Sequence, residues 1–97
     1  MVGYEYHPAA ETEYLAAIRY YSRVSLELGM SFVTGVESAI QRARQFPEAY
    51  GKVTDSLRHI GTHRFPYAII YECRGDRIVI WAVAHTSREP GYWKARI

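Results

Sequence analysis

The segment RFPYAIIYECRGDRIVIWAVAH, residues 64–85, decides the fold of this chain. It consists of two apolar runs, about 64–73 and 77–85, separated by Gly75-Asp76, and glycine followed by aspartate is favoured in two-residue hairpin loops. Isoleucine, valine and aromatic residues dominate both runs, as in buried β-strands. The segment therefore predicts an antiparallel β-hairpin with little exposed surface.

The hairpin loop also predicts a register: Arg74 opposite Arg77, Ile70 opposite Trp81, Ala68 opposite Val83, and Pro66 opposite His85. One face of the hairpin is then almost entirely apolar and is expected to pack against helices; it carries Phe65, Tyr67, Ile69, Tyr71, Ile78, Ile80, Ala82 and Ala84. The other face brings Arg64 and His85 together. This pairing depends on the turn, because a shift of one residue moves every side chain of a strand to the opposite face.

The sequence before the hairpin predicts one more strand of the meander, at about 57–60, and two helices. Apolar residues recur at steps of three and four over about Pro8 to Leu28 and again over Met30 to Phe46, with Gly29 expected to join the two helices. A short strand at Val2 to Tyr6 precedes them. The predicted fold class is therefore α+β: an N-terminal strand, an antiparallel two-helix hairpin, and a three-stranded antiparallel meander, with all strands in one sheet.

Length and composition restrict the classes of function. The chain has 97 residues, 48% hydrophobic and 23% charged, so we expect a single domain spanning residues 1–97. Without a signal-peptide pattern or an apolar run near the roughly 18 residues that cross a bilayer, we expect a cytoplasmic protein with no membrane contact. Cys73 is the only cysteine and no Cys/His group has zinc spacing, so neither disulfide, metal nor cofactor is expected.

Candidate catalytic residues lie in the second half of the chain. RNA cleavage requires a base, a cation that stabilises the charge on phosphate, and an acid for the leaving oxygen. His85 and Arg64 suit two of these roles, and Tyr92 suits proton donation or base stacking. Structural roles are the alternative for two of them: His85 caps the end of a strand, and Arg64 pairs with a carboxylate. Glu13 and the other helix glutamates are interpreted as solvated.

The basic, aromatic tail that follows the last strand is a candidate target-binding surface. Its contact residues would be Arg88, Tyr92, Trp93 and Lys94. The alternative is that the two aromatic rings form a lid packed on the sheet. The helical hairpin is a second candidate surface, because its apolar stripes are wider than one four-stranded sheet can cover. Tyr14, Tyr21 and Phe32 are the residues expected to contact a partner there.

Several motifs, in order and spacing, resemble the RelE/ParE family of toxins from type II toxin–antitoxin systems. They are Pro8-Ala9-Ala10-Glu11, Tyr20-Tyr21, Leu28-Gly29 with Phe32, Phe46-Pro47-Glu48-Ala49-Tyr50, the run from Phe65 to Tyr71, and the run from His85 to Trp93. The resemblance extends over nearly the whole chain. It implies a bacterial toxin that inhibits growth when free, encoded beside an antitoxin that wraps it in a hetero-oligomer.

The resemblance implies two alternative targets. Arg64 and His85 match positions that the RelE-like branch uses to cut ribosome-bound mRNA. That branch usually continues with tyrosine after the histidine, whereas this chain continues with Thr86, and no residue matches its general-base glutamate or lysine cluster. The tail with Tyr92 and Trp93 is more similar to ParE-like plasmid-stabilisation proteins, which favours a non-enzymatic inhibitor of DNA gyrase. An inactive relative that serves only as a binding module is the third alternative.

Overall fold

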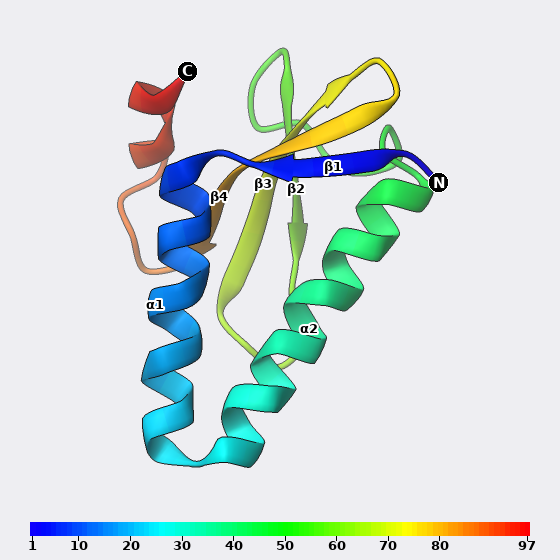
Figure 1. The fold of residues 1–97 in the computed structure, drawn as a ribbon. Helices are drawn as coiled ribbons and strands as arrows, with labels where there is room; N and C mark the ends of the chain where they lie inside the picture. Colours follow the sequence, from blue (N-terminus) through cyan, green and yellow to red (C-terminus); the bar gives the residue numbers. More distant parts are fainter.

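The computed structural model describes residues 1–97 and consists of two α-helices, one four-stranded sheet and a C-terminal 3₁₀ helix (Figure 1). The elements in chain order are β1 (Gly3–Tyr6), α1 (Pro8–Val24), α2 (Leu26–Gln45), β2 (Leu57–Gly61), β3 (Tyr67–Arg74), β4 (Arg77–His85) and η1 (Tyr92–Arg96). The expected α+β class, with its strand, helical hairpin and meander in one sheet, is confirmed. No helix is both long and apolar enough to cross a bilayer.

The strand order is β1-β4-β3-β2, so the last strand of the chain lies inside the sheet. β4 pairs antiparallel with β3 and parallel with β1, which makes the sheet mixed. The parallel pair results from chain direction, since the two helices and two strands between β1 and β4 return the chain to run alongside its own beginning. Figure 1 shows β1 and α1 next to β4, the last strand in the sequence.

The helices join at Ser25, so the prediction that Gly29 joins them is wrong. Ser25 has an extended backbone, its N–H donates to Tyr21 O of α1 at 3.2 Å, and its Oγ accepts from Leu28 N–H of α2 at 3.0 Å. One residue therefore caps both helices. Serine fits this position because its hydroxyl satisfies a backbone donor that the start of α2 would otherwise leave without a partner.

Gly29 has a packing role instead. It is buried inside α2, and a Cβ atom built on it would lie 2.1 Å from Ser22 Oγ and 3.1 Å from Ser22 Cα of the preceding helix. Real Cβ atoms essentially never approach another atom to within 3.0 Å, so a side chain at this position would require Ser22 to move. The glycine thus permits the two helices to meet just after the turn, which sets the V shape visible in Figure 1.

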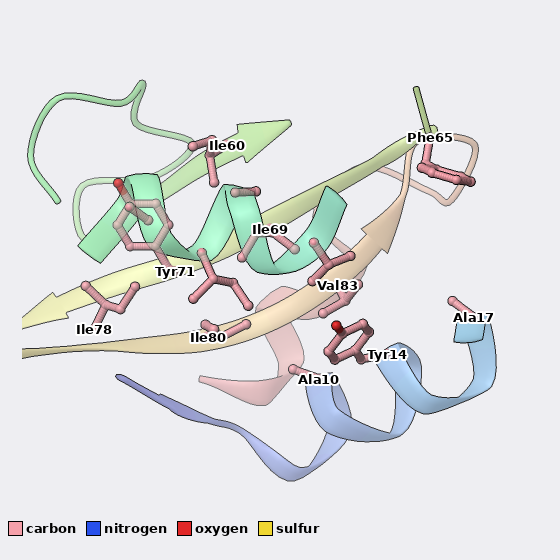
Figure 2. Close-up of a cluster of buried hydrophobic side chains, with 14 of the residues drawn as sticks. Ala10, Tyr14, Ala17, Ile60, Phe65, Ile69, Tyr71, Ile78, Ile80 and Val83 are labelled. Carbon is pink, nitrogen blue, oxygen red and sulfur yellow. The ribbon is translucent and has the colours of Figure 1, made fainter. Parts of the chain in front are cut away.

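The main core lies between the helices and one face of the sheet (Figure 2). α1 contributes small residues and one tyrosine, and α2 contributes Phe32, Val36 and Ile40. The sheet contributes Ile60, Ile69, Tyr71, Ile78, Ile80 and Val83, and the loop before β3 contributes Phe65. Ile69 and Ile80 have no exposed surface, which confirms that the helices pack on the predicted face of the hairpin. Tyr67 is half-buried at the edge of this core.

The predicted register holds only near the turn. Arg74 pairs with Arg77 as expected, but a β-bulge at Trp81 adds one residue to β4, so that Ile70 pairs with Ala82 and Tyr67 with His85. Because side chains alternate between the two faces of a sheet, the extra residue moves every later side chain of β4 to the face opposite the predicted one. The predicted pairings of Trp81, Val83 and His85 are therefore wrong. Ala82 and Ala84 face away from the helices, whereas Val83 joins the main core.

A second buried cluster covers the opposite face of the sheet. It consists of Leu57, Ile70, Val79, Trp81, Ala82, Ala84 and Trp93. Trp93 belongs to η1, so the C-terminal segment is the element that closes this face. The two alanines of β4 leave room for its indole ring, which is 6% exposed. Both faces of the sheet are thus covered, one by helices and one by the end of the chain.

Candidate functional site

The Glu13 carboxylate fastens the C-terminal segment to α1. Arg96 donates to it through both terminal nitrogens, Nη1 to Oε1 at 2.9 Å and Nη2 to Oε2 at 2.8 Å. The Tyr92 hydroxyl donates to Oε2 at 2.5 Å, and the Val83 N–H donates to Oε1 at 3.1 Å. One side chain therefore joins α1, β4 and η1. We call Glu13, Tyr92, Arg96 and Arg88 the Glu13 cluster.

Two arginines enclose the ring of Tyr92 in this cluster. The guanidinium carbon of Arg88 lies 3.9 Å from the ring centroid and that of Arg96 lies 5.2 Å from it. Arg96 also donates to Trp81 O at 2.9 Å, while Arg88 Nη1 lies 3.9 Å from Glu13 Oε2. Arg96 is largely enclosed, whereas Arg88 remains exposed. The cluster thus contains one structural cation and one that faces solvent.

Ionisation of the cluster follows from its contacts. Burial opposes the charge on Glu13, but hydrogen bonds from Arg96, Tyr92 and the Val83 N–H outweigh it and place the pKa of the carboxyl below its ordinary value. The pKa of Tyr92 is raised, first by burial and then by its hydrogen bond to Glu13. The hydrogen bond to the same carboxylate raises the pKa of Arg96. At neutral pH the cluster therefore holds an ionised carboxylate and a neutral phenol.

The C-terminal segment, residues 86–97, presents basic side chains on a fixed backbone. Trp93 is buried against the sheet and Tyr92 is held by Glu13, so neither ring is free to bind a target. Arg88 and Lys94 are exposed. The Lys94 stem lies across Gly91, which has φ +78°, a conformation that favours glycine. Of the four residues expected to bind a target, the structure makes two available and uses two as anchors.

His85 lies in a hollow of about 290 Å³ between α1 and the end of β4. Its ring packs edge-on against Tyr67, with centroids 5.0 Å apart, and Tyr20 and Arg88 also line the hollow. The Nδ1 atom of His85 accepts the Ser87 N–H at 3.0 Å, so Nε2 is the nitrogen left for other contacts. A histidine, an arginine and two tyrosines therefore share one hollow on the helix side of the sheet.

Arg64 is not part of that hollow, so the prediction that Arg64 and His85 share a face is wrong. The bulge at Trp81 turns His85 toward α1, and β3 begins only at Tyr67, which leaves Arg64 in the preceding loop. There it lines a different hollow beside α2. Arg64 is thus separated from the rest of the predicted catalytic set, whereas His85 and Tyr92 both line one hollow at the end of β4.

The residues expected to bind a partner on the helical hairpin lie mostly inside the fold. Phe32 has no exposed surface, and Tyr14 is 8% exposed with its hydroxyl donating to Glu37 at 2.9 Å. Tyr21 is half-buried and its ring contacts Phe32 and Phe65, with centroids 4.9 Å away in each case. The exposed apolar side chains of the hairpin are Leu15, Tyr20, Val24, Leu26 and Met30.

Glu13 and Arg96 are the site residues that sequence reasoning missed. The interpretation of Glu13 as a solvated helix residue is wrong, because its side chain is only 16% exposed and accepts four hydrogen bonds. Helical spacing carried a signal: Glu13 stands three residues after Ala10 and four before Ala17, both buried. No group of three His, Cys, Asp or Glu side chains is arranged to hold a metal ion.

Comparison with known proteins agrees with the architecture. The family model for "ParE toxin of type II toxin-antitoxin system, parDE" matches residues 4–90. A solved structure described as "Chromosomal ParDE TA system from P. aeruginosa" is similar in fold, with a TM-score of 0.76 and 15% sequence identity over 90% of this chain and 98% of that one. No curated protein matches the chain.

The family match spans most of the chain, whereas the structural match, at its low identity, supports the fold alone. A toxin of a toxin–antitoxin system has a cognate antitoxin as its partner. The chain therefore belongs to the ParE toxin family, as the toxin component of a type II toxin–antitoxin system.

Proposed function

We propose that this toxin acts in the cytoplasm by binding DNA gyrase and inhibiting it without cutting RNA. The membership in the ParE family favours this target over the ribosome. The observation that carries the proposal is the C-terminal segment, which is anchored at Tyr92, Trp93 and Arg96 and presents Arg88 and Lys94 to solvent. A pre-ordered segment loses little conformational entropy when it binds.

The basic side chains suit a negatively charged surface. The Arg88 guanidinium packs on the Tyr92 ring and lies within ion-pair distance of the Glu13 carboxylate, so the position of this exposed side chain is restricted. Cations on a fixed surface raise the rate of association with an acidic partner and fix its orientation. We propose that Arg88 and Lys94 contact the target, and that the Glu13 cluster keeps them in place.

Cleavage of RNA is the second candidate, and one observation favours it. His85, Arg88, Tyr20 and Tyr67 line a single hollow, and this set contains a proton-transfer group, a cation and stacking surfaces. Arg64, the cation that the resemblance pairs with His85, lies elsewhere. The hollow therefore lacks the arrangement expected of the RNA-cleaving branch, and we rank this function second.

Expression of the toxin in growing cells, with DNA supercoiling, DNA breaks and mRNA integrity followed together, separates these functions. Inhibition of gyrase predicts altered supercoiling or broken DNA while mRNA stays intact. Early loss of mRNA that is abolished by His85→Gln would contradict the gyrase proposal and support the second candidate. Normal growth with abundant, folded toxin would indicate an inactive relative that serves only as a binding module.

A further inference from the structure

A hollow of about 320 Å³ lies on the face of the sheet opposite the helices, between the C-terminal segment and the loop that leads into β2. Ile70 and Trp93 form its floor, since they are only 4% and 6% exposed. Val53 and Pro90 add apolar surface that is open to solvent. We call this site the Lys94 hollow, after the one lysine that lines it.

The fold places two polar side chains beside this apolar floor. His59 of β2 pairs with Ile70 of β3, so both side chains point to the same face of the sheet. A Cβ atom built on Gly51 would lie 3.4 Å from His59 Nε2, and one built on Gly91 would lie 3.1 Å from Lys94 Cε and 3.4 Å from its Nζ. Each side chain therefore packs over a glycine, which restricts the position of its nitrogen.

The charge of the Lys94 hollow is not balanced within the chain. Lys94 enters none of the five ion pairs, and none of the residues that line the hollow is acidic. Two carboxylates close to it in sequence lie outside it: Glu89 lines the hollow at the end of β4, and Asp55 is exposed in the loop before β2. The hollow thus offers a cation and an imidazole next to an apolar floor.

We propose that the Lys94 hollow receives an apolar side chain of gyrase, and that Lys94 binds a carboxylate beside that side chain with a further hydrogen bond from His59. The inference rests on the proposed function and adds the chemistry of the bound segment. Anchors that fill a pocket dominate the free energy of binding at protein interfaces, and a neighbouring charge pair fixes their orientation. Val53 and His59 thereby join the C-terminal segment in one contact surface.

Size and chemistry favour a segment of protein over nucleic acid as the occupant. Ligand sites commonly have volumes of about 300–1,000 Å³, so a hollow at the small end of this range holds one or two side chains. Single-stranded nucleic acid binds along a row of cations and stacks its bases on exposed aromatic rings. The Lys94 hollow has one lysine, and the Trp93 ring is packed on the sheet.

Two substitutions probe the hollow without touching the anchor of the C-terminal segment. Val53 and His59 are exposed and belong neither to the Glu13 cluster nor to a buried core cluster. Val53→Asp places a negative charge against the expected carboxylate, and His59→Ala removes the imidazole. Ser56→Asp, in the same loop but outside the hollow, and His63→Ala, at another exposed histidine, are the matched controls. Circular dichroism establishes that each variant is folded.

Calorimetry measures the binding of each purified toxin to gyrase without DNA and to a DNA duplex without gyrase, and a supercoiling assay measures inhibition. We expect Val53→Asp to raise the Kd for gyrase by about tenfold or more and His59→Ala by about threefold or more. Ser56→Asp and His63→Ala should change it by less than about twofold. The toxin concentration that gives half inhibition should rise in the same order.

Folded Val53→Asp and His59→Ala proteins that bind gyrase as tightly as the unmodified toxin would overturn the inference and leave the proposed function intact. Binding to the DNA duplex that is lost in Val53→Asp would also overturn it, because the occupant would then be nucleic acid. If the unmodified toxin neither bound nor inhibited gyrase, the proposed function and this inference would both be rejected.

Discussion

Replacing Glu13 with glutamine is expected to destabilise the fold by about 2–4 kcal/mol, because the carboxylate is the common acceptor for Arg96, Tyr92 and a backbone N–H. The side chains of Glu13 and Arg96 are 16% and 17% exposed, so water can replace few of the hydrogen bonds that the substitution removes. Single hydrogen bonds to a charged group contribute about 1.5–3 kcal/mol and are not additive within one cluster. The amide NH₂ of glutamine would also face donors rather than acceptors.

Urea denaturation followed by circular dichroism and tryptophan fluorescence measures this loss. A decrease of about 3 kcal/mol corresponds to roughly 12–24 °C in Tm for a domain of this size. Glu11→Gln is the matched control: it lies on the same helix, is exposed, and should change the free energy of unfolding by less than about 0.5 kcal/mol. An equally small effect of Glu13→Gln would refute the reasoning and leave Trp93 as the anchor of the C-terminal segment.

The same pair of proteins makes the pH dependence measurable. The pKa of Glu13 is lowered in the folded state from its ordinary value of 4.5, so the unfolded chain binds the proton more tightly. The stabilisation by the carboxylate is therefore complete above pH 4.5 and is lost as the pH falls through the folded-state pKa. The difference in unfolding free energy between the unmodified protein and Glu13→Gln should shrink in acid. A difference that stays constant from neutral pH to about pH 3 would contradict the assignment.

Three further outcomes follow from packing and chemistry. Gly29→Ala should destabilise the fold by about 1–3 kcal/mol through its clash with the neighbouring helix, whereas Gly35→Ala, in the same helix with ordinary contacts, should be neutral or stabilise it by about 0.5–1 kcal/mol in urea denaturation. Ile40→Ala and Ile80→Ala should each lower the free energy of unfolding by about 2–5 kcal/mol, since both side chains are enclosed in the core. His85→Gln should leave growth inhibition intact, and loss of inhibition in a folded protein would favour RNA cleavage.

The elements of the fold were predictable because they rest on local signals. Apolar periodicity identified both helices, and Gly75-Asp76 fixed the turn of the hairpin and the pairing next to it. The face toward the helices was correct for Ile69, Tyr71, Ile78 and Ile80. These features depend on neighbours in sequence, where spacing and turn preference determine the outcome.

The β-bulge in β4 and the Glu13 cluster depend on contacts that the spacing of residues along the sequence does not reveal. Trp81 leaves the ladder in a place where its ring stacks on His7, with centroids 5.0 Å apart, and its Nε1 donates to Glu72 at 3.1 Å. Glu13 meets Arg96 across 83 residues of chain. Neither pairing has a local signature, so the faces beyond the bulge and the anchor of the C-terminal segment had to come from the three-dimensional structure.

The proposed function depends on which residues of the C-terminal segment remain available. Removing Tyr92 and Trp93 would not isolate target binding, because Trp93 closes one face of the sheet and Tyr92 belongs to the Glu13 cluster. Arg88 and Lys94 provide a cleaner test. Both are exposed: Arg88 lies at the solvent-facing edge of the Glu13 cluster, and Lys94 lies outside that cluster.

Inhibition of purified DNA gyrase in a supercoiling assay is the most direct measurement of the central claim. The account predicts that the toxin inhibits supercoiling, and that the folded double variant Arg88→Ala/Lys94→Ala inhibits it about tenfold less strongly or worse. The matched double variant Arg19→Ala/Arg23→Ala, with two exposed arginines of α1, should inhibit like the unmodified toxin. Absence of inhibition by the unmodified toxin, or full inhibition by Arg88→Ala/Lys94→Ala, would contradict the claim that the C-terminal segment acts on gyrase.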